Sequence, residues 1–317
     1  MNQYYELNDT KNLSSFYEDD QKRIKYLRIP PNWNSIKVTK DPSSKIQVTG
    51  KDAKGRTQYI YHPAWVQFSK ETKYSKVNSI NFTTFENIIK RYSEFNGLYS
   101  KNYIIANMFI LMKDLNIRVG NEKYLEENDS VGLCTLSKSH YKKVKSNGSN
   151  GSNGSNGING SNGSNGSNES NGSNVHKFIF KGKKGIIHEK ILLPKHITFI
   201  ENIISLPGKS LFKYSNASNE SNEKGNKSNK GNKVYKKITA DDLNQFLKEY
   251  VDKYMSCKDI RTYCANTIFK REYSKLIKSG VNAKKARIEA TKITANELGN
   301  TPKVCRDSYI DPMLYSE

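Results

Sequence analysis

The chain has 317 residues, 52 of them Lys or Arg and 31 Asp or Glu, so its formal net charge is +21. This length allows about two domains. The basic excess points to a polyanionic partner, nucleic acid ahead of an anionic membrane, although a lysine-rich proteome alone would also explain it. No apolar run approaches the roughly 18 residues that cross a bilayer, which argues against a membrane-spanning helix.

The compartment is predicted from the N-terminus and the cysteines. Residues 1–20 are acidic and polar and lack the basic start and apolar stretch of a secretory signal. The four cysteines form no C-x-x-C pair, and no histidine cluster accompanies them at metal-ligand spacing. We therefore expect free thiols in a reducing, intracellular compartment and no metal site.

Residues 21–74 predict a small β-rich unit. Short alternating segments rich in β-branched residues are separated by turns at Asp41-Pro42-Ser43-Ser44 and at residues 50–55. The expected strands are 36–39, 45–49 and 57–61.

A helical period begins near Thr83. Phe85, Ile88, Ile89 and Tyr92 form one apolar stripe, and residues 102–115 are apolar over most of the helix surface, which is typical of a buried helix. Thr239 followed by Asp242 predicts an N-terminal cap. Further helices are expected over 243–250, 258–278 and 283–298, with Gly280 between the last two and Gly299 closing the last.

Two low-complexity stretches interrupt this pattern. Residues 146–174 are nearly pure Ser, Asn and Gly, and residues 215–233 are Ser, Asn, Lys and Glu with almost no apolar side chains. Neither can bury enough surface to offset its chain entropy, so both are predicted to be flexible loops inserted in the second domain. A binding role is the alternative.

Four segments carry residue types suited to breaking a phosphodiester without a metal. That reaction needs an in-line nucleophile, fixed positive charge on the phosphoryl oxygens and a proton donor for the leaving oxygen. Arginine suits the second task because its planar guanidinium binds phosphate bidentately. Lysine suits the third where nearby cations lower its pKa.

These segments, in this order, resemble the active-site signatures of the type IB DNA topoisomerases. They are Arg118-Val-Gly-Asn-Glu-Lys-Tyr124 with Val131-Gly-Leu-Cys-Thr-Leu136, Phe180-Lys-Gly-Lys183-Lys-Gly-Ile-Ile-His188, Lys258-Asp-Ile-Arg261-Thr-Tyr-Cys-Ala-Asn266, and Leu298-Gly-Asn-Thr-Pro-Lys-Val-Cys-Arg-Asp-Ser-Tyr309. Arg28-Ile-Pro-Pro-Asn-Trp33 and residues 50–63 resemble the DNA-clamping domain of the small poxvirus and bacterial type. The Asn/Lys bias and the inserts suggest a large DNA virus of the mimivirus kind.

The resemblance implies a role for each candidate residue. Tyr309 would attack the phosphate and become joined to the 3′ end of the nicked strand. Arg118 and Arg261 would bind the nonbridging oxygens. Lys183, flanked by the alternatives Lys181 and Lys184, would protonate the leaving 5′ oxygen.

Two more catalytic candidates carry lesser roles. Lys258, one helical turn before Arg261, would assist as a second proton donor. Asn300 stands nine residues before Tyr309, where many family members have His. Its amide can still donate to a phosphoryl oxygen, so activity is expected with a weaker pH dependence near neutrality. The alternative is a helix C-terminal residue with no catalytic part.

Six residues are candidates for DNA contact. The resemblance assigns the strand over 57–61 to the major groove, where Gln can read a base edge and Tyr can contact a phosphate or a thymine methyl. Because strand side chains alternate, Gln58 and Tyr59 are expected on opposite faces. A packed aromatic strand is the alternative for the tyrosines. The candidates are Arg56, Gln58, Tyr59, Tyr61, Lys123 and Tyr124.

The sequence therefore predicts an α+β protein, with a β-rich clamping domain over 1–74, a linker over 75–82 and a mainly helical catalytic domain with a short β-hairpin over 83–317. The predicted function is ATP- and metal-independent relaxation of supercoiled duplex DNA by a monomer that needs no cofactor or small ligand, in a virion or a cytoplasmic viral factory. The alternatives are a tyrosine recombinase, although Lys258 replaces its usual His, and a non-catalytic basic DNA-packaging protein.

Overall fold

The computed structural model describes residues 3–7, 13–94, 99–145, 174–215 and 234–316. The chain divides into two compact units, Met1–Ser79 and Ile80–Glu317, and each is described by itself. The predicted low-complexity loops lie outside the described residues except at Asn174 and Ser215, which belong to strands.

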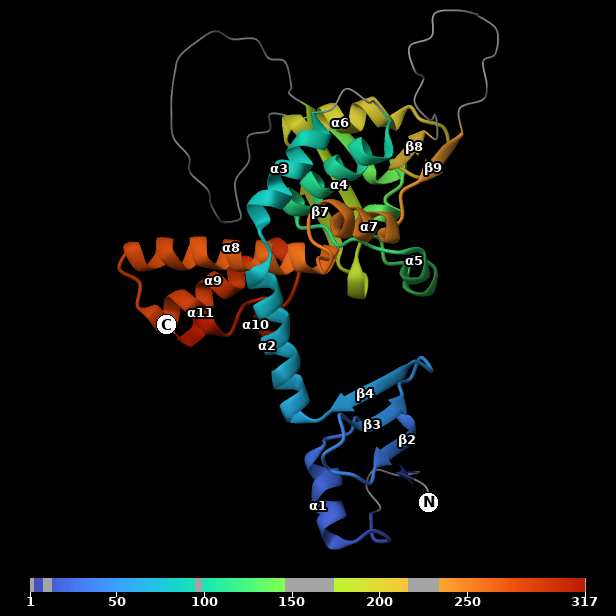
Figure 1. Ribbon diagram of the computed structural model, residues 1–317, viewed down its shortest axis with the longest axis vertical. Helices are drawn as coiled ribbons and strands as arrows, with labels where there is room; N and C mark the ends of the chain where they lie inside the picture. Colours follow the sequence, from blue (N-terminus) through green and yellow to red (C-terminus); the bar gives the residue numbers. More distant parts are fainter. Residues whose placement is uncertain (1–2, 8–12, 95–98, 146–173, 216–233, 317) are drawn as a thin grey trace, which may run out of the picture. The chain divides into compact units, whose positions relative to one another are not determined.

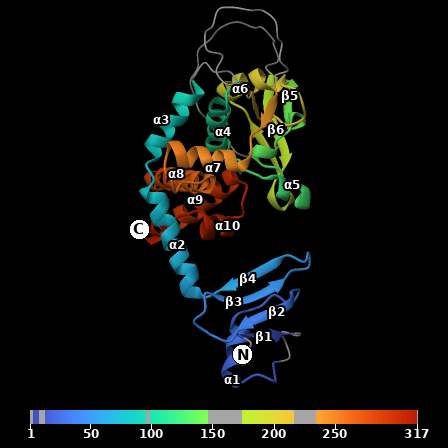
Figure 2. The ribbon, with the colours of Figure 1, turned by 45° about the vertical axis from the view of Figure 1, so that its right-hand side comes forward.

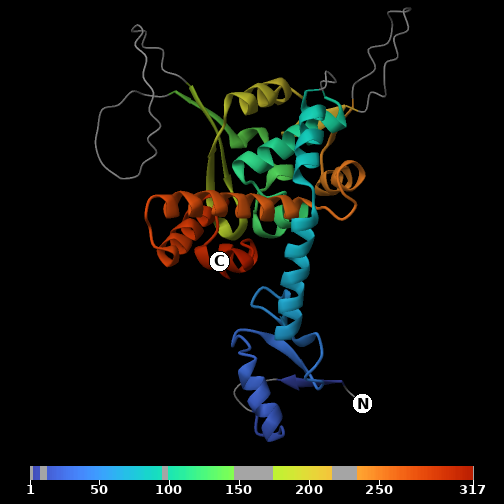
Figure 3. The same cartoon turned by 60° about the vertical axis from the view of Figure 1, so that its left-hand side comes forward.

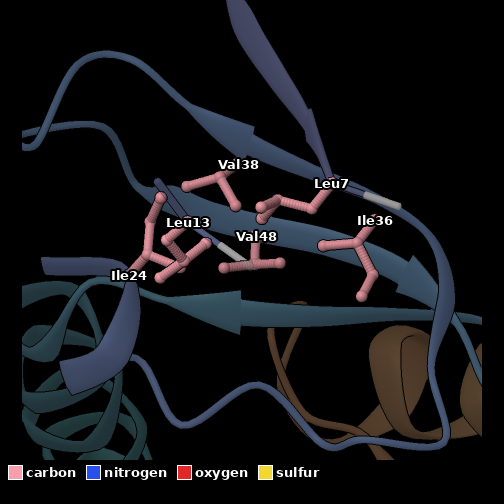
Figure 4. Close-up of a cluster of buried hydrophobic side chains, with 6 residues drawn as sticks. All are labelled: Leu7, Leu13, Ile24, Ile36, Val38 and Val48. Atoms are coloured by element: carbon pink, nitrogen blue, oxygen red, sulfur yellow. The ribbon is translucent and has the colours of Figure 1, made fainter. Parts of the chain in front are cut away.

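The first unit is built on a four-stranded antiparallel sheet in the order β1-β2-β3-β4 (Figure 1). Apolar side chains of the sheet meet Ile24 of a short helix and form one small core, in which Val38 and Val48 are almost completely buried. Figure 4 shows these side chains pointing toward one another. The strands are β1 (Tyr4–Leu7), β2 (Asn34–Thr39), β3 (Ile46–Lys51) and β4 (Thr57–Tyr61).

Two helices of this unit differ from the prediction. α1 (Glu18–Tyr26) overlaps the expected β-rich range, and α2 (Pro63–Ser79) runs through most of the expected linker. α1 has acidic residues in its first turn and basic ones in its last, which complement the helix dipole but give no apolar stripe. In α2, Val66 and Phe68 are exposed while Tyr74 and Val77 are buried, so its apolar residues do not form the single face that periodicity detects.

The second unit is organised around α4 (Lys101–Leu115), the predicted buried helix. Ile104, Met108 and Phe109 have no exposed surface. Helices α3 (Phe82–Ser93), α6 (Pro194–Ile204) and α7 (Ala240–Tyr250) lie around α4 (Figures 1 and 2). The predicted cap of α7 is confirmed, because the Thr239 hydroxyl accepts from the Asp242 N–H at 3.2 Å.

Two small antiparallel sheets belong to the same unit. β5 (Tyr141–Lys145), β6 (Asn174–Lys181) and β7 (Ile187–Ile191) form one, and β8 (Lys213–Ser215) pairs with β9 (Tyr235–Lys237) in the other. A 3₁₀ turn at Lys183–Gly185 joins β6 to β7, which agrees with the expected hairpin.

The C-terminal part is helical. α8 (Cys257–Lys278) packs along α9 (Ala283–Leu298), followed by α10 (Pro302–Ser308) and α11 (Met313–Ser316). α8 is the long orange helix in Figure 3. Gly299 ends α9 in the left-handed conformation at φ 61°, as the sequence predicts for a helix stop. A core around Phe269, Ala290 and Cys305 fixes α10 against these helices.

All four cysteines are buried and none is in a disulfide. Among the described residues, no three His, Cys, Asp or Glu side chains gather in a way that could hold a metal ion. In the same part of the chain, no helix has both the length and the apolar character needed to cross a bilayer.

Candidate active site

Arg118 follows the C-terminus of α4 on a segment held by a close glycine contact. The N–H groups of Leu133 and Cys134 donate to the carbonyls of Arg118 and Val119, both at 2.8 Å. Gly120 and Gly132 face each other so closely that a Cβ on Gly132 would lie 2.5 Å from the Gly120 Cα. The backbone of Arg118 is therefore fixed by a pairing that only glycine permits.

Arg261 is held from α8 by two backbone carbonyls. Its Nη1 donates to the Asn116 carbonyl and its Nη2 to the Leu298 carbonyl, and the side chain is almost completely buried. Burial first, and then the charge of Arg118, lowers the pKa of Arg261 to about 10. The guanidinium therefore stays charged at neutral pH, because that pKa is still well above 7.

Tyr309 follows α10 and lies beneath Arg261, whose Cζ is 5.3 Å from the centre of the phenol ring. Burial raises the pKa of Tyr309, but the charges of Arg261 and Arg118, together with hydrogen bonds from both, lower it overall. Both guanidiniums therefore act on the phenol and stabilise its ionised form relative to that of an exposed tyrosine.

Asn300 completes this group of side chains next to Arg118. Arg118 Nη2 donates to the Asn300 side-chain oxygen at 2.5 Å. Among the described residues, Asn300 Nδ2 and Arg261 Nε are buried donors without an acceptor. Buried donors usually have partners, so these two mark a place where an oxygen-rich ligand would bind.

The two candidate proton donors lie at the surface. Lys183 is exposed in the turn between β6 and β7, directly after the buried Gly182, and Lys258 is exposed in the first turn of α8. Lys181, the alternative to Lys183, pairs with Asp129 at 3.0 Å. The structure therefore brings Arg118, Arg261, Asn300 and Tyr309 together, with the two lysines on neighbouring segments.

The candidate DNA contacts of the first unit lie on β4 and the turn before it. Tyr59 and Tyr61 share the exposed face, with ring centroids 6.0 Å apart, so they are not core residues. Gln58 is on the opposite face, as the alternation predicts, and donates to Asp52 at 3.0 Å. Arg56 pairs with the same carboxylate at 2.7 Å.

The candidate contacts of the second unit lie on α5 (Glu122–Asn128). Lys123 and Tyr124 are both exposed in its first turn. Asn121 caps this helix by accepting from the Tyr124 N–H at 2.9 Å.

Three residues to which the sequence assigned no role contact the segments that carry these side chains. Asn266 binds the backbone around Tyr309, while His188 and Lys190 reach the end of α9 from β7. Asn266 and His188 end two of the quoted signatures, and this was the only signal for them. Lys190 carried none, because a lysine on a strand is usually a solvated charge.

Comparisons of the sequence with known proteins point to one family. A family model described as "Eukaryotic DNA topoisomerase I, catalytic core" matches residues 63–311, and one described as "Bacterial DNA topoisomerase IB, N-terminal domain" matches residues 5–52. DNA topoisomerase 1B of Acanthamoeba polyphaga mimivirus is 29% identical over 97% of this chain and 81% of its own length. DNA topoisomerase 1B of vaccinia virus (strain Copenhagen) is 26% identical over 90% of this chain and 78% of its own length.

The first of these models covers most of the chain, including the two arginines and the tyrosine of this group. It describes a topoisomerase core, which decides against both the recombinase and the packaging protein. The α+β fold, the phenol close to two guanidiniums and the viral relatives therefore lead to one conclusion: the chain belongs to the type IB DNA topoisomerases, isomerases that act on DNA.

Proposed function

We propose that Tyr309 is the nucleophile of this enzyme and that Arg118, Arg261 and Asn300 bind the nonbridging oxygens of the phosphate it attacks. The observation that carries the proposal is the Arg261 guanidinium 5.3 Å from the centre of the Tyr309 ring, where its charge and that of Arg118 lower the pKa of the phenol. The same charges would stabilise the negative charge that grows on the phosphoryl oxygens in the transition state.

The proposed reaction exchanges one phosphodiester for another. The Tyr309 hydroxyl gives up its proton to solvent, its oxygen forms a bond to phosphorus, the bond to the 5′ oxygen breaks, and a 3′-phosphotyrosyl linkage remains. Lys183, assisted by Lys258, gives the leaving oxygen its proton. Religation reverses every step. Because the linkage conserves the energy of the broken bond, we expect relaxation without ATP and in the presence of a metal chelator.

Lys183 is the proposed donor for a local reason. Lys181 is engaged with Asp129, and Lys184 follows in a left-handed conformation at φ 64°. Lys183 comes directly after Gly182, which packs on His188, and His188 packs in turn on Gly299, the residue before Asn300. An exposed lysine in such a turn is free to reach a phosphate that binds over the arginines.

DNA contact is proposed for two exposed sets of side chains. Tyr59 and Tyr61 present adjacent rings on β4, and Lys123 and Tyr124 extend from α5. Gln58 and Arg56 both bind the Asp52 carboxylate. To contact DNA, they would have to leave that carboxylate and bind a base edge or a phosphate instead. Loss of Lys123 should weaken binding to all sequences equally if it contacts phosphate.

We propose that one chain suffices for catalysis, because the phenol, both arginines and both lysines come from the second unit. The viral relatives support the proposal that the enzyme acts in a virion or in a cytoplasmic viral factory. Light scattering of the purified protein and immunoblots of purified particles test these two points.

The deciding experiment compares Tyr309→Phe with the natural protein on supercoiled plasmid, with EDTA and without ATP. We expect the variant to lose both relaxation and the covalent protein–DNA adduct trapped by detergent. Tyr254→Phe is the matched control, because Tyr254 is an exposed tyrosine of the same unit. Full relaxation by Tyr309→Phe would refute the proposal.

A further inference from the structure

Strand β7 turns two basic side chains toward the interior. Burial alternates along it, with Ile187, Glu189 and Ile191 exposed and His188 and Lys190 partly covered. Histidine and lysine on the covered face of a strand need partners, because a polar group loses its hydration there.

Lys190 finds its partner at the end of α9. Its Nζ donates to the Glu297 carbonyl at 3.0 Å. The last carbonyls of a helix lack intrahelical donors and carry partial negative charge, so an ammonium is a suitable ligand for them. The next carbonyl, that of Leu298, accepts from Arg261.

His188 packs against Gly299, the residue that follows Leu298 at the end of α9. One edge of its ring faces Gly299, where an added Cβ would overlap Cε1. The opposite edge faces Gly182, where an added Cβ would lie 2.5 Å from Cδ2. The ring also stacks on Phe180, with centroids 5.2 Å apart. His188 is therefore wedged between two glycines from segments far apart in the chain.

These contacts join the turn that carries the proposed proton donor to the residues proposed to bind the phosphate. Gly182 precedes Lys183, and Gly299 precedes Asn300. Each of the residues 297–300 thus contacts one basic side chain. Glu297 and Leu298 accept hydrogen bonds from Lys190 and Arg261, Gly299 packs against His188, and Asn300 accepts from Arg118. The end of α9 is the common support of the two guanidiniums and of the strand that follows the lysine turn.

We propose that His188 and Lys190 are positioning residues that fasten the lysine turn to the end of α9 and so set where Lys183 meets the leaving oxygen. This inference rests on the role proposed above for Lys183. It makes His188 and Lys190 act on one step, protonation of the 5′ oxygen, and not on attack by Tyr309.

The test uses two duplexes that carry the cleavage site mapped on plasmid, one natural and one with sulfur in place of the bridging 5′ oxygen. A thiolate leaves without a proton because its conjugate acid is far stronger than an alcohol. Single-turnover formation of the covalent adduct is measured with the full chain for Lys183→Ala, His188→Ala and Lys190→Met. Glu189→Gln is the control, since Glu189 lies between the pair on the exposed face.

Lys183→Ala should cleave the oxygen duplex about 100-fold to 10,000-fold more slowly and the sulfur duplex at nearly the natural rate. His188→Ala and Lys190→Met should lose about tenfold or more on oxygen and also recover on sulfur. Combined with Lys183→Ala, neither should slow the oxygen reaction further, because effects on one step are not additive. Recovery on sulfur also demonstrates that the variants fold.

The inference is overturned if the two variants slow both duplexes equally, which would indicate general damage, or if neither slows the oxygen duplex. Failure of the proposed function gives a different pattern. Lys183→Ala itself would then remain slow on sulfur, and the role of the pair would fall with that of the lysine.

Discussion

The side-chain amide of Asn266 holds the backbone on both sides of the nucleophile: its Nδ2 donates to the Tyr309 carbonyl at 3.1 Å, and its oxygen accepts from the Asp311 N–H at 2.8 Å. Asn266 is on α8, in the turn of helix that follows Arg261. One helix therefore carries a guanidinium that lies over the phenol and an amide that fixes the chain bearing it.

Replacing Asn266 by Ala should misplace Tyr309. We expect covalent adduct formation to slow by about 100-fold, the effect of a displacement of about 1 Å at a reacting group. The free energy of unfolding should fall by about 1–3 kcal/mol because two partly buried backbone groups each lose a hydrogen bond. Asn107→Ala removes a similar hydrogen bond, from a side-chain amide to the Tyr103 carbonyl on α4, and should leave the rate unchanged. An unchanged rate in Asn266→Ala would contradict the positioning role.

A second prediction concerns the contact between Gly120 and Gly132, which fixes the backbone of Arg118. In Gly132→Ala the new Cβ would meet the Gly120 N and the Arg118 O at 2.6 and 2.8 Å. Backbone cannot move cheaply, so we expect a loss of at least about 1–3 kcal/mol in urea unfolding. A clear loss of cleavage should accompany it, because the segment that shifts carries Arg118.

Gly280→Ala is the control for this glycine contact. Gly280 has φ +81°, and no heavy atom of the described residues lies within 4 Å of the place that a new Cβ would occupy. The change should therefore cost about 1 kcal/mol through backbone strain and leave cleavage intact. Equal cleavage by the two variants would show that the Gly120–Gly132 contact does not position the arginine.

The pH dependence of cleavage should depend on Arg118. Its positive charge helps to lower the pKa of Tyr309, so Arg118→Gln should raise that pKa and move the rise of the rate toward alkaline pH. Arg118→Lys keeps the charge and should move the profile less. The measurement is the initial rate of adduct formation between about pH 6 and pH 10. If the normalised pH profiles of the natural protein and Arg118→Gln superimposed, the charge of Arg118 would not affect the pKa of Tyr309.

His188 should make the fold sensitive to acid. Burial, followed by the charges of Lys190, Arg118 and Arg261, lowers its pKa from 6.5 to about 4. Between these values the unfolded chain binds a proton that the folded chain does not, so stability falls as the pH falls through this window. Urea unfolding at several pH values should give a shallower slope for His188→Ala than for the natural protein. Identical slopes would refute the lowered pKa.

Much of the fold could be predicted because its elements follow simple periods. The strands β2, β3 and β4 and the helices α3, α4, α7, α8 and α9 appear within a few residues of their predicted limits, whereas β1 was not predicted. α2 could not be predicted, because its exposed Phe68 and buried Tyr74 do not share a face. Periodicity identifies a helix best when its apolar residues gather on one side, and in α2 they do not.

The site was predicted less by pattern than by resemblance. Nothing in the spacing of Arg118, Arg261 and Tyr309 requires them to meet; the family signatures selected them, and the structure brings them together. The wedge of His188 between Gly182 and Gly299 could not be predicted, because it depends on the approach of two backbones from distant segments. Single glycines in a sequence do not reveal which side chain fills the space beside them.

Lys145 pairs with Asn174, and Ser215 pairs with Tyr235, so the residues that border each Ser- and Asn-rich stretch face each other in one sheet. The entropy of closing a loop between two facing residues grows by only about 0.6 kcal/mol per doubling of its length, so additional repeats between them would change the stability of the fold little. Related strains could carry repeats of very different extent and still inherit the same catalytic geometry.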